Sequence, residues 1–69
     1  MQLVDFLSLP IDTSDNTIID VVYENGDYAG VVGAHDGVEG RCRILSDYLD
    51  REILAVSIQD AGYVVVTIG

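Results

Sequence analysis

The sequence contains no lysine, and its three arginines stand against twelve aspartates and glutamates. The formal net charge is −9 over 69 residues. This imbalance argues against direct binding to nucleic acid or to an anionic membrane, because both need clusters of Lys and Arg. It favours a basic protein surface as partner. The other explanation, which the sequence leaves open, is that the acidity serves only solubility.

Cysteine is almost absent as well. Cys42 is the only one, so no internal disulfide can form and a reducing compartment is expected. No apolar run approaches the roughly 20 residues that a membrane-spanning helix needs. The N-terminal MQLVDFLSLP lacks the basic region of a signal peptide. These absences predict a cytoplasmic protein.

The chain has the size of one small domain, residues 1–69. Apolar residues make up 49% of it and mean hydropathy is +0.33, which is typical of a folded protein and not of a disordered one. A core of this size leaves stability marginal, because only about 60% of the unfolded chain's surface can be buried. Dimerisation would compensate for the small core.

The first element that the sequence predicts is a short helix that stops before Pro10. Leu3, Phe6 and Leu7 have helical spacing and lie on one side of it. A turn through residues 11–16 leads to a strand at 17–24, which is rich in β-branched residues. Asn25-Gly26 then predicts a type I′ hairpin turn. The returning strand, 27–32, would bring Tyr28 close to Tyr23 across that turn.

The second half of the sequence predicts the same order of elements, a helix followed by two strands. Residues 33–40 contain three glycines and are expected to form a loop. Residues 41–52 place Ile44, Leu45, Tyr48 and Leu49 on one side of an amphipathic helix. Strands at 53–58 and 63–68 follow, joined by a hairpin turn at Gly62. The fold class is therefore α+β, in the order α-β-β-α-β-β, with a four-stranded antiparallel sheet and two short helices on one face.

The segment IDTSDNTIID resembles the opening of a calcium loop, with Asp12, Ser14 and Asn16 at alternate positions. An EF-hand next needs glycine at the sixth position and glutamate at the twelfth, where this chain has Thr17 and Tyr23. The interpretation retained is an Asx-type turn.

Catalytic and cofactor patterns are equally weak. His35, beside Asp36, lies seven residues before Cys42, so a Cys–His pair is conceivable, but a glycine-rich loop gives such a pair little support. The segment GVVGAHDG lacks the Lys and Ser/Thr of a P-loop. One Cys and one His leave a zinc site short of ligands. We expect no enzyme activity, no metal and no cofactor.

The arginines flank the second predicted helix, where ion pairing with neighbouring carboxylates is their expected use. Arg41 and Arg43 alternatively serve as interface anchors. No basic residue falls between residues 12 and 39, so that half is expected to present an acidic surface with aromatic contact area. The predicted partner-binding residues are Asp12, Asp15, Asp20, Tyr23, Glu24, Asp27, Tyr28, Asp36 and Glu39.

Four stretches, LVDFLSL, IIDVVYENG, YLDREILAVSI and YVVVTI, resemble a broad set of small acidic proteins from phages and mobile elements, which includes anti-CRISPR inhibitors. The segment GVVGAHDGVEGRCR departs from their pattern. The resemblance implies a non-enzymatic inhibitor in the host cytoplasm that binds a nucleic-acid-binding protein, such as a CRISPR effector, by mimicking nucleic acid. The alternative is a small structural or assembly module that acts as a homo-oligomer.

Overall fold

The computed structural model describes residues 1–11 and 16–69. Its helices and strands are α1 (Leu3–Leu7), β1 (Ile18–Tyr23), β2 (Tyr28–Gly33), α2 (Gly37–Ile44), β3 (Ile53–Asp60) and β4 (Tyr63–Ile68). Two 3₁₀ turns, η1 (Ala34–Asp36) and η2 (Ser46–Tyr48), flank α2 and were not predicted. The predicted turn at 11–16 falls mostly outside the described residues. Within them, no helix is long and apolar enough to cross a membrane.

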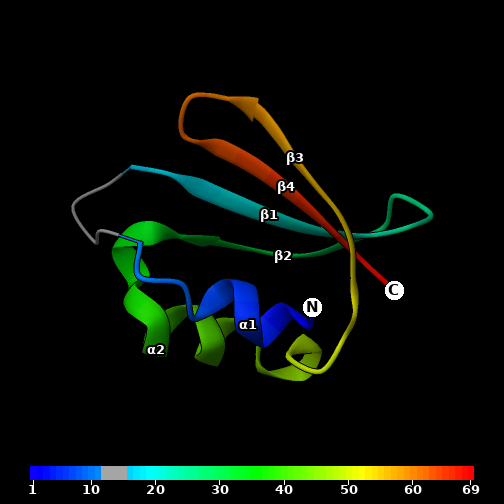
Figure 1. Ribbon diagram of the computed structural model, residues 1–69, viewed down its shortest axis with the longest axis horizontal. Coiled ribbons are helices and arrows are strands. Elements are labelled where there is room, and N and C mark those ends of the chain that lie inside the picture. The colour runs from blue at the N-terminus through cyan, green and yellow to red at the C-terminus, as the bar shows by residue number, and fades with distance from the viewer. Residues whose placement is uncertain (12–15) are drawn as a thin grey trace.

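The four strands form one mixed sheet in the order β2-β1-β4-β3 (Figure 1). Both hairpins are antiparallel, as predicted, but the central strands β1 and β4 run parallel, with Ile19 beside Val64 and Val21 beside Val66. The prediction of a purely antiparallel sheet was therefore wrong. The chain leaves β2 at one edge, passes through α2 and reaches β3 at the opposite edge, so β4 returns into the centre beside β1.

The turn between β1 and β2 has three residues, 24–26, between the hydrogen-bonded pair Tyr23 and Asp27, and it is not of type I′. A type I′ turn needs positive φ at two residues, but Gly26 is the only one here, at +93°. The Gly26 N–H donates to the Tyr23 carbonyl at 2.9 Å, and the Tyr23 N–H donates to the Asp27 carbonyl at 2.8 Å. The Asn25 side chain accepts from the Asp27 N–H at 3.0 Å. That Asx bond holds Asn25 at ordinary φ.

Both helices lie on one side of the sheet, as predicted, and enclose the core (Figure 1). The core cluster contains Leu3, Leu7, Ile19, Val21, Val32, Leu45, Val66 and Ile68, all almost fully buried. The buried residues of β1 and β4 alternate along each strand, which is the pattern of a sheet with one covered face. β3 differs, because every residue after Ile53 in this strand is exposed.

The second helix begins four residues earlier than predicted and ends at Ile44. The predicted loop at 33–40 is thus the last residue of β2, followed by η1 and the first half of α2. The predicted apolar stripe along one side of this helix is not formed, because Ile44 is half exposed while Leu45 is buried just past the helix end. Tertiary contacts decide the register: α2 turns Arg41, not an apolar stripe, into the protein.

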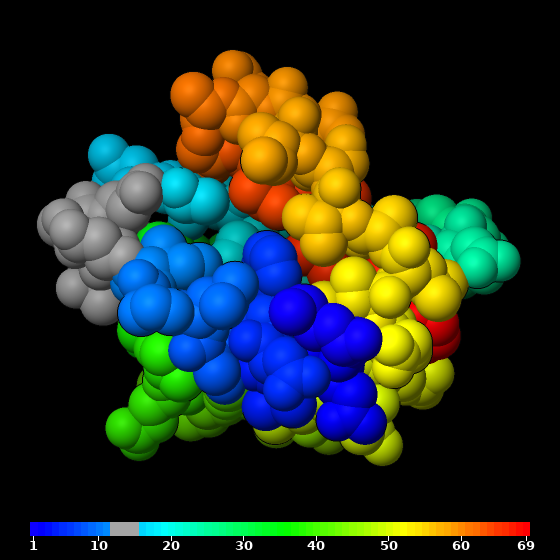
Figure 2. Space-filling model, in the orientation of Figure 1, coloured from blue at the N-terminus to red at the C-terminus, as the bar shows by residue number. Residues whose placement is uncertain are grey.

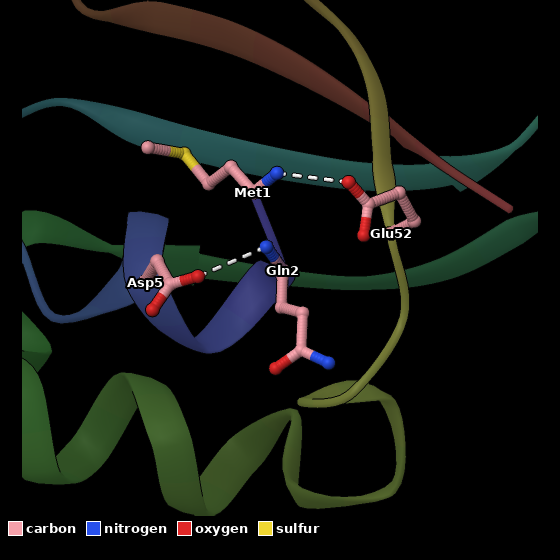
Figure 3. Close-up of polar contacts among 4 residues, drawn as sticks. All are labelled: Met1, Gln2, Asp5 and Glu52. Carbon is pink, nitrogen blue, oxygen red and sulfur yellow. Dashed lines mark hydrogen bonds and ion pairs between the residues drawn. The ribbon is translucent and has the colours of Figure 1, made fainter.

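The N-terminal segment is fastened beside the start of β3 (Figure 3). The Met1 ammonium forms an ion pair with the Glu52 carboxylate at 2.8 Å, and Asp5 accepts a hydrogen bond from the Gln2 N–H at 3.0 Å. Backbone bonds support the same junction, since Leu3 N–H donates to the Arg51 carbonyl at 2.8 Å. These contacts hold α1 against the segment that leads into β3.

Candidate partner-binding surface

The side of the sheet away from the helices, here called the open face, has no described helix over it (Figure 1). The strand registers assign its residues, because directly paired positions share a face. They are Ile18, Asp20 and Val22 of β1, Tyr28 and Val31 of β2, Ala55, Ser57 and Asp60 of β3, and Tyr63, Val65 and Thr67 of β4. Two of them carry a charge, Asp20 and, at the end of β3, Asp60. The open face is therefore mostly apolar, with one carboxylate near its centre.

Asp20 is held by an aromatic side chain from the neighbouring strand. The Tyr63 hydroxyl donates a hydrogen bond to its carboxylate across the parallel β1–β4 pair. This bond raises the pKa of the Tyr63 hydroxyl above its ordinary value, and burial, the Asp20 charge and Tyr28 act in the same direction. The carboxylate is thereby fixed in position on the open face while it stays accessible to a partner.

The two tyrosines predicted to form one aromatic patch lie on opposite faces. Tyr28 pairs with Val22 and stands on the open face, where 61% of its side chain is exposed. Tyr23 points to the helix side, half buried, and packs edge-on against Tyr48 with ring centroids 6.0 Å apart. The pairing of β1 with β2 is irregular near these two tyrosines, with a bulge between Val21 and Val22. Tyr28 is therefore available to a partner on the open face, and Tyr23 is used inside the fold.

The other predicted acidic residues are spread over the molecule. Glu24 and Asp27 are exposed in the β1–β2 hairpin, next to Tyr28. Asp36 is half buried and accepts a hydrogen bond from the Gly33 N–H at 2.7 Å, so it has a structural role in η1. Glu39 is exposed on α2. Asp12 and Asp15 lie outside the described residues.

Arg41 makes no contribution to the protein surface. Its side chain is fully buried and its guanidinium donates to three carbonyl oxygens, those of Leu7, Leu9 and Ala34, each at 3.0 Å. The prediction that Arg41 forms ion pairs or anchors an interface was wrong. A buried charge is tolerated only when its hydrogen bonds are made, and these carbonyls provide them.

The remaining arginines are exposed. Arg51 donates to the Gly69 carbonyl at 3.1 Å and lies over the Tyr23 ring, 5.8 Å from its centroid. Among the described residues, the ion pairs within 4.0 Å are Met1–Glu52 and His35–Asp36, so the predicted arginine–carboxylate pairs are not formed there. The surface carboxylates are consequently left with little neutralisation.

The residues considered for catalysis differ in their surroundings. His35 is exposed and 3.6 Å from the Asp36 carboxylate, while Cys42 is half buried against the core. A shallow depression of about 370 Å³ lies elsewhere, at the carboxyl ends of β1 and β4, lined by Tyr23, Glu24, Asn25, Ile68 and Gly69. Glu24 is the one charged group in that lining.

Comparisons of the chain with protein-family models, curated proteins and solved structures find no match. The surface therefore has to be interpreted from its own chemistry. One of its residues, Tyr63, was not predicted. Its position on the side of β4 shared with Val65 was a signal, but only the parallel β1–β4 pairing places it beside Asp20.

Proposed function

We propose that this protein is a non-enzymatic inhibitor that binds a basic surface of a host nucleic-acid-binding protein, in the manner of small phage-encoded anti-CRISPR proteins. The binding surface is the open face together with the adjoining β1–β2 hairpin. Its acidic residues are Asp20, Glu24 and Asp27, and Tyr28 and Tyr63 provide the aromatic contact area.

The burial of Arg41 is the observation that supports this proposal best. One of the three arginines is withdrawn from the surface. The solvent-facing charge is therefore more negative than the sequence total of −9 indicates. A surface of this kind attracts a groove lined with Lys and Arg and speeds the encounter with it.

The open face adds a reason for specificity. Asp20 is oriented by Tyr63, so a basic side chain that enters meets a carboxylate fixed in place beside aromatic rings. Aromatic residues and arginine pair often in protein interfaces. A protein that used its charge for solubility alone would have no need to orient a carboxylate within an apolar surface.

The test is inhibition of target-DNA binding by purified CRISPR effector–guide complexes from several classes. Wild type should block DNA binding by at least one complex, and the inhibition should weaken as salt is raised. The variant Glu24→Lys/Asp27→Lys should lose inhibition. The matched control Asp47→Lys/Asp50→Lys changes the net charge equally, near η2, and should keep it.

Two results would contradict the proposal. If no complex is inhibited at low salt, the effector class of partner is wrong. If the control pair loses inhibition while the hairpin pair keeps it, the surface is wrong. Circular dichroism of both variants separates a lost contact from a lost fold, and Asp20→Asn tests the centre of the open face without adding a positive charge.

A further inference from the structure

The outer strand β3 is an exposed sheet edge whose middle lacks the features that usually protect one. Natural edge strands carry a lysine, a proline or an inward-pointing charge that prevents another strand from pairing with them. Residues 53–59, ILAVSIQ, contain none of these. Irregular pairing is confined to the two ends, between Ile53 and Ala55 and between Ile58 and Asp60, so the middle of the strand is regular.

Large apolar side chains line the helix side of this edge. Val56 and Ile58 share that side with the core residues Val66 and Val64, to which they are paired. The helices do not extend over them, and 46% of Val56 and 77% of Ile58 is exposed. In Figure 2 the hairpin of β3 and β4, yellow to red-orange, stands clear of the N-terminal helix, and atoms of β4 are visible in the hollow between them.

We propose that β3 pairs antiparallel with β3 of a second copy of this chain, forming a dimer with a continuous eight-stranded sheet. Charge is the first reason that the occupant is a second copy. The net charge of −9 opposes self-association almost everywhere on the surface, but the stretch 53–59 is neutral. Two copies that meet along it bring no carboxylates of that stretch together.

Self-complementarity of the strand is the second reason. Side chains directly opposite each other in an antiparallel pair lie on the same face of the sheet. A two-fold axis that relates two copies of one strand must therefore place one residue opposite its own copy. With the axis at Ser57, Val56 of each copy lies opposite Ile58 of the other on the helix side. Small residues, Ala55 and Ser57, occupy the open face near the axis. The pairing buries apolar surface against apolar surface.

The dimer has a consequence for partner binding. A two-fold axis perpendicular to the sheet leaves both open faces on the same side. The two Asp20–Tyr63 pairs would then form one extended acidic and aromatic surface. The dimer goes beyond the proposed inhibitor function and does not depend on it, since dimer mass and inhibition are measured separately.

The first test is the molar mass in solution, by sedimentation equilibrium over a wide concentration range. Wild type should approach twice the chain mass of 7.5 kDa. Ile58→Lys places a lysine on the edge and should leave a monomer. Ile44→Lys is the matched control, because it adds the same charge at another exposed isoleucine, on α2, and should stay dimeric. A wild type that remains monomeric at every concentration would overturn the proposal, as would loss of the dimer in the control alone.

The second test reads the register directly and does not need a destabilising change. Ser57→Cys and Ala55→Cys, each in a Cys42→Ala background, put one thiol on the open side of β3. Under mild oxidation Ser57→Cys should form a disulfide-linked dimer, because this residue lies opposite itself, and Ala55→Cys should not. Crosslinking of Ala55→Cys alone would refute the Ser57 axis, and crosslinking of neither would refute the β3 pairing.

Discussion

The buried Arg41 guanidinium donates through Nε to the carbonyl oxygen of Leu7, 34 residues earlier in the chain, at 3.0 Å. Leu7 ends α1, so its carbonyl has no partner within the helix. The same guanidinium reaches the carbonyls of Leu9 and Ala34. One side chain therefore joins the end of α1, the segment after it and η1 to α2.

Replacement of Arg41 should be the most damaging single arginine substitution. Arg41→Ala removes three hydrogen bonds, leaves the Leu7 carbonyl without its donor and creates a cavity, so we expect a loss of roughly 3 kcal/mol or more in the free energy of unfolding. Arg43→Ala, at an exposed position on the same helix, should change it by less than about 0.5 kcal/mol. Urea denaturation of the two variants checks this, and equal losses would show that the three bonds contribute little.

The Tyr63–Asp20 hydrogen bond should be visible in the alkaline titration of the tyrosines. Because the pKa of Tyr63 is raised in the folded protein, the protonated hydroxyl stabilises the fold. That contribution is complete below the unfolded-state tyrosine pKa of about 10 and is lost as pH rises through the higher folded value. Asp20→Asn should therefore shift one tyrosine to a lower pKa in an ultraviolet absorbance titration.

Tyr28→Phe is the control for that titration, since it removes an open-face hydroxyl but leaves the Asp20 bond in place. Tyr63→Phe should delete the same late-titrating group that Asp20→Asn shifts. Tyr48, whose pKa is raised chiefly by its hydrogen bond with Tyr23, should titrate late in all these variants. Identical curves for wild type and Asp20→Asn would mean that the bond is absent in solution.

Gly30 should tolerate no side chain while Leu45 occupies its present position. A Cβ built at Gly30 would lie 2.7 Å from Leu45 Cδ2, which is too close for two carbon atoms. Leu45 is buried and cannot move freely, so Gly30→Ala should cost about 1–3 kcal/mol through overpacking. Leu45→Val removes the conflicting methyl group, and the double variant should be more stable than the sum of the single losses predicts. Strict additivity in denaturation experiments would disprove the contact.

Moderate salt should stabilise the domain. Surface carboxylates repel one another, and one of the three arginines, Arg41, is inside the protein and bound to neutral carbonyls. Counterions screen this repulsion over about 10 Å at 0.1 M ionic strength. Thermal unfolding from low salt to about 0.3 M should give a rising midpoint. A constant or falling midpoint would show that the carboxylates are compensated locally.

Much of the open face could be predicted from the sequence. Period-two alternation separates Ile19 and Val21 from Ile18 and Asp20, and burial in the structure confirms that separation. The contact between Asp20 and Tyr63 could not be predicted, because nothing in either hairpin specifies which of its strands lies beside the other hairpin. The placement of Tyr23 and Tyr28 on opposite faces could not be predicted either, because it depends on the three-residue turn and the bulge that follows it.

By itself the sequence determined the elements whose signals are local. Pro10 limits α1, Gly62 permits the second turn at a φ of +85°, and stretches rich in β-branched residues define β1 and β4. Tertiary structure decided the rest. The register of α2 follows from three carbonyl groups to which the buried Arg41 donates, and the parallel centre of the sheet follows from the path of the chain from β2 to β3. Both depend on groups that are distant in sequence, so no local pattern encodes them.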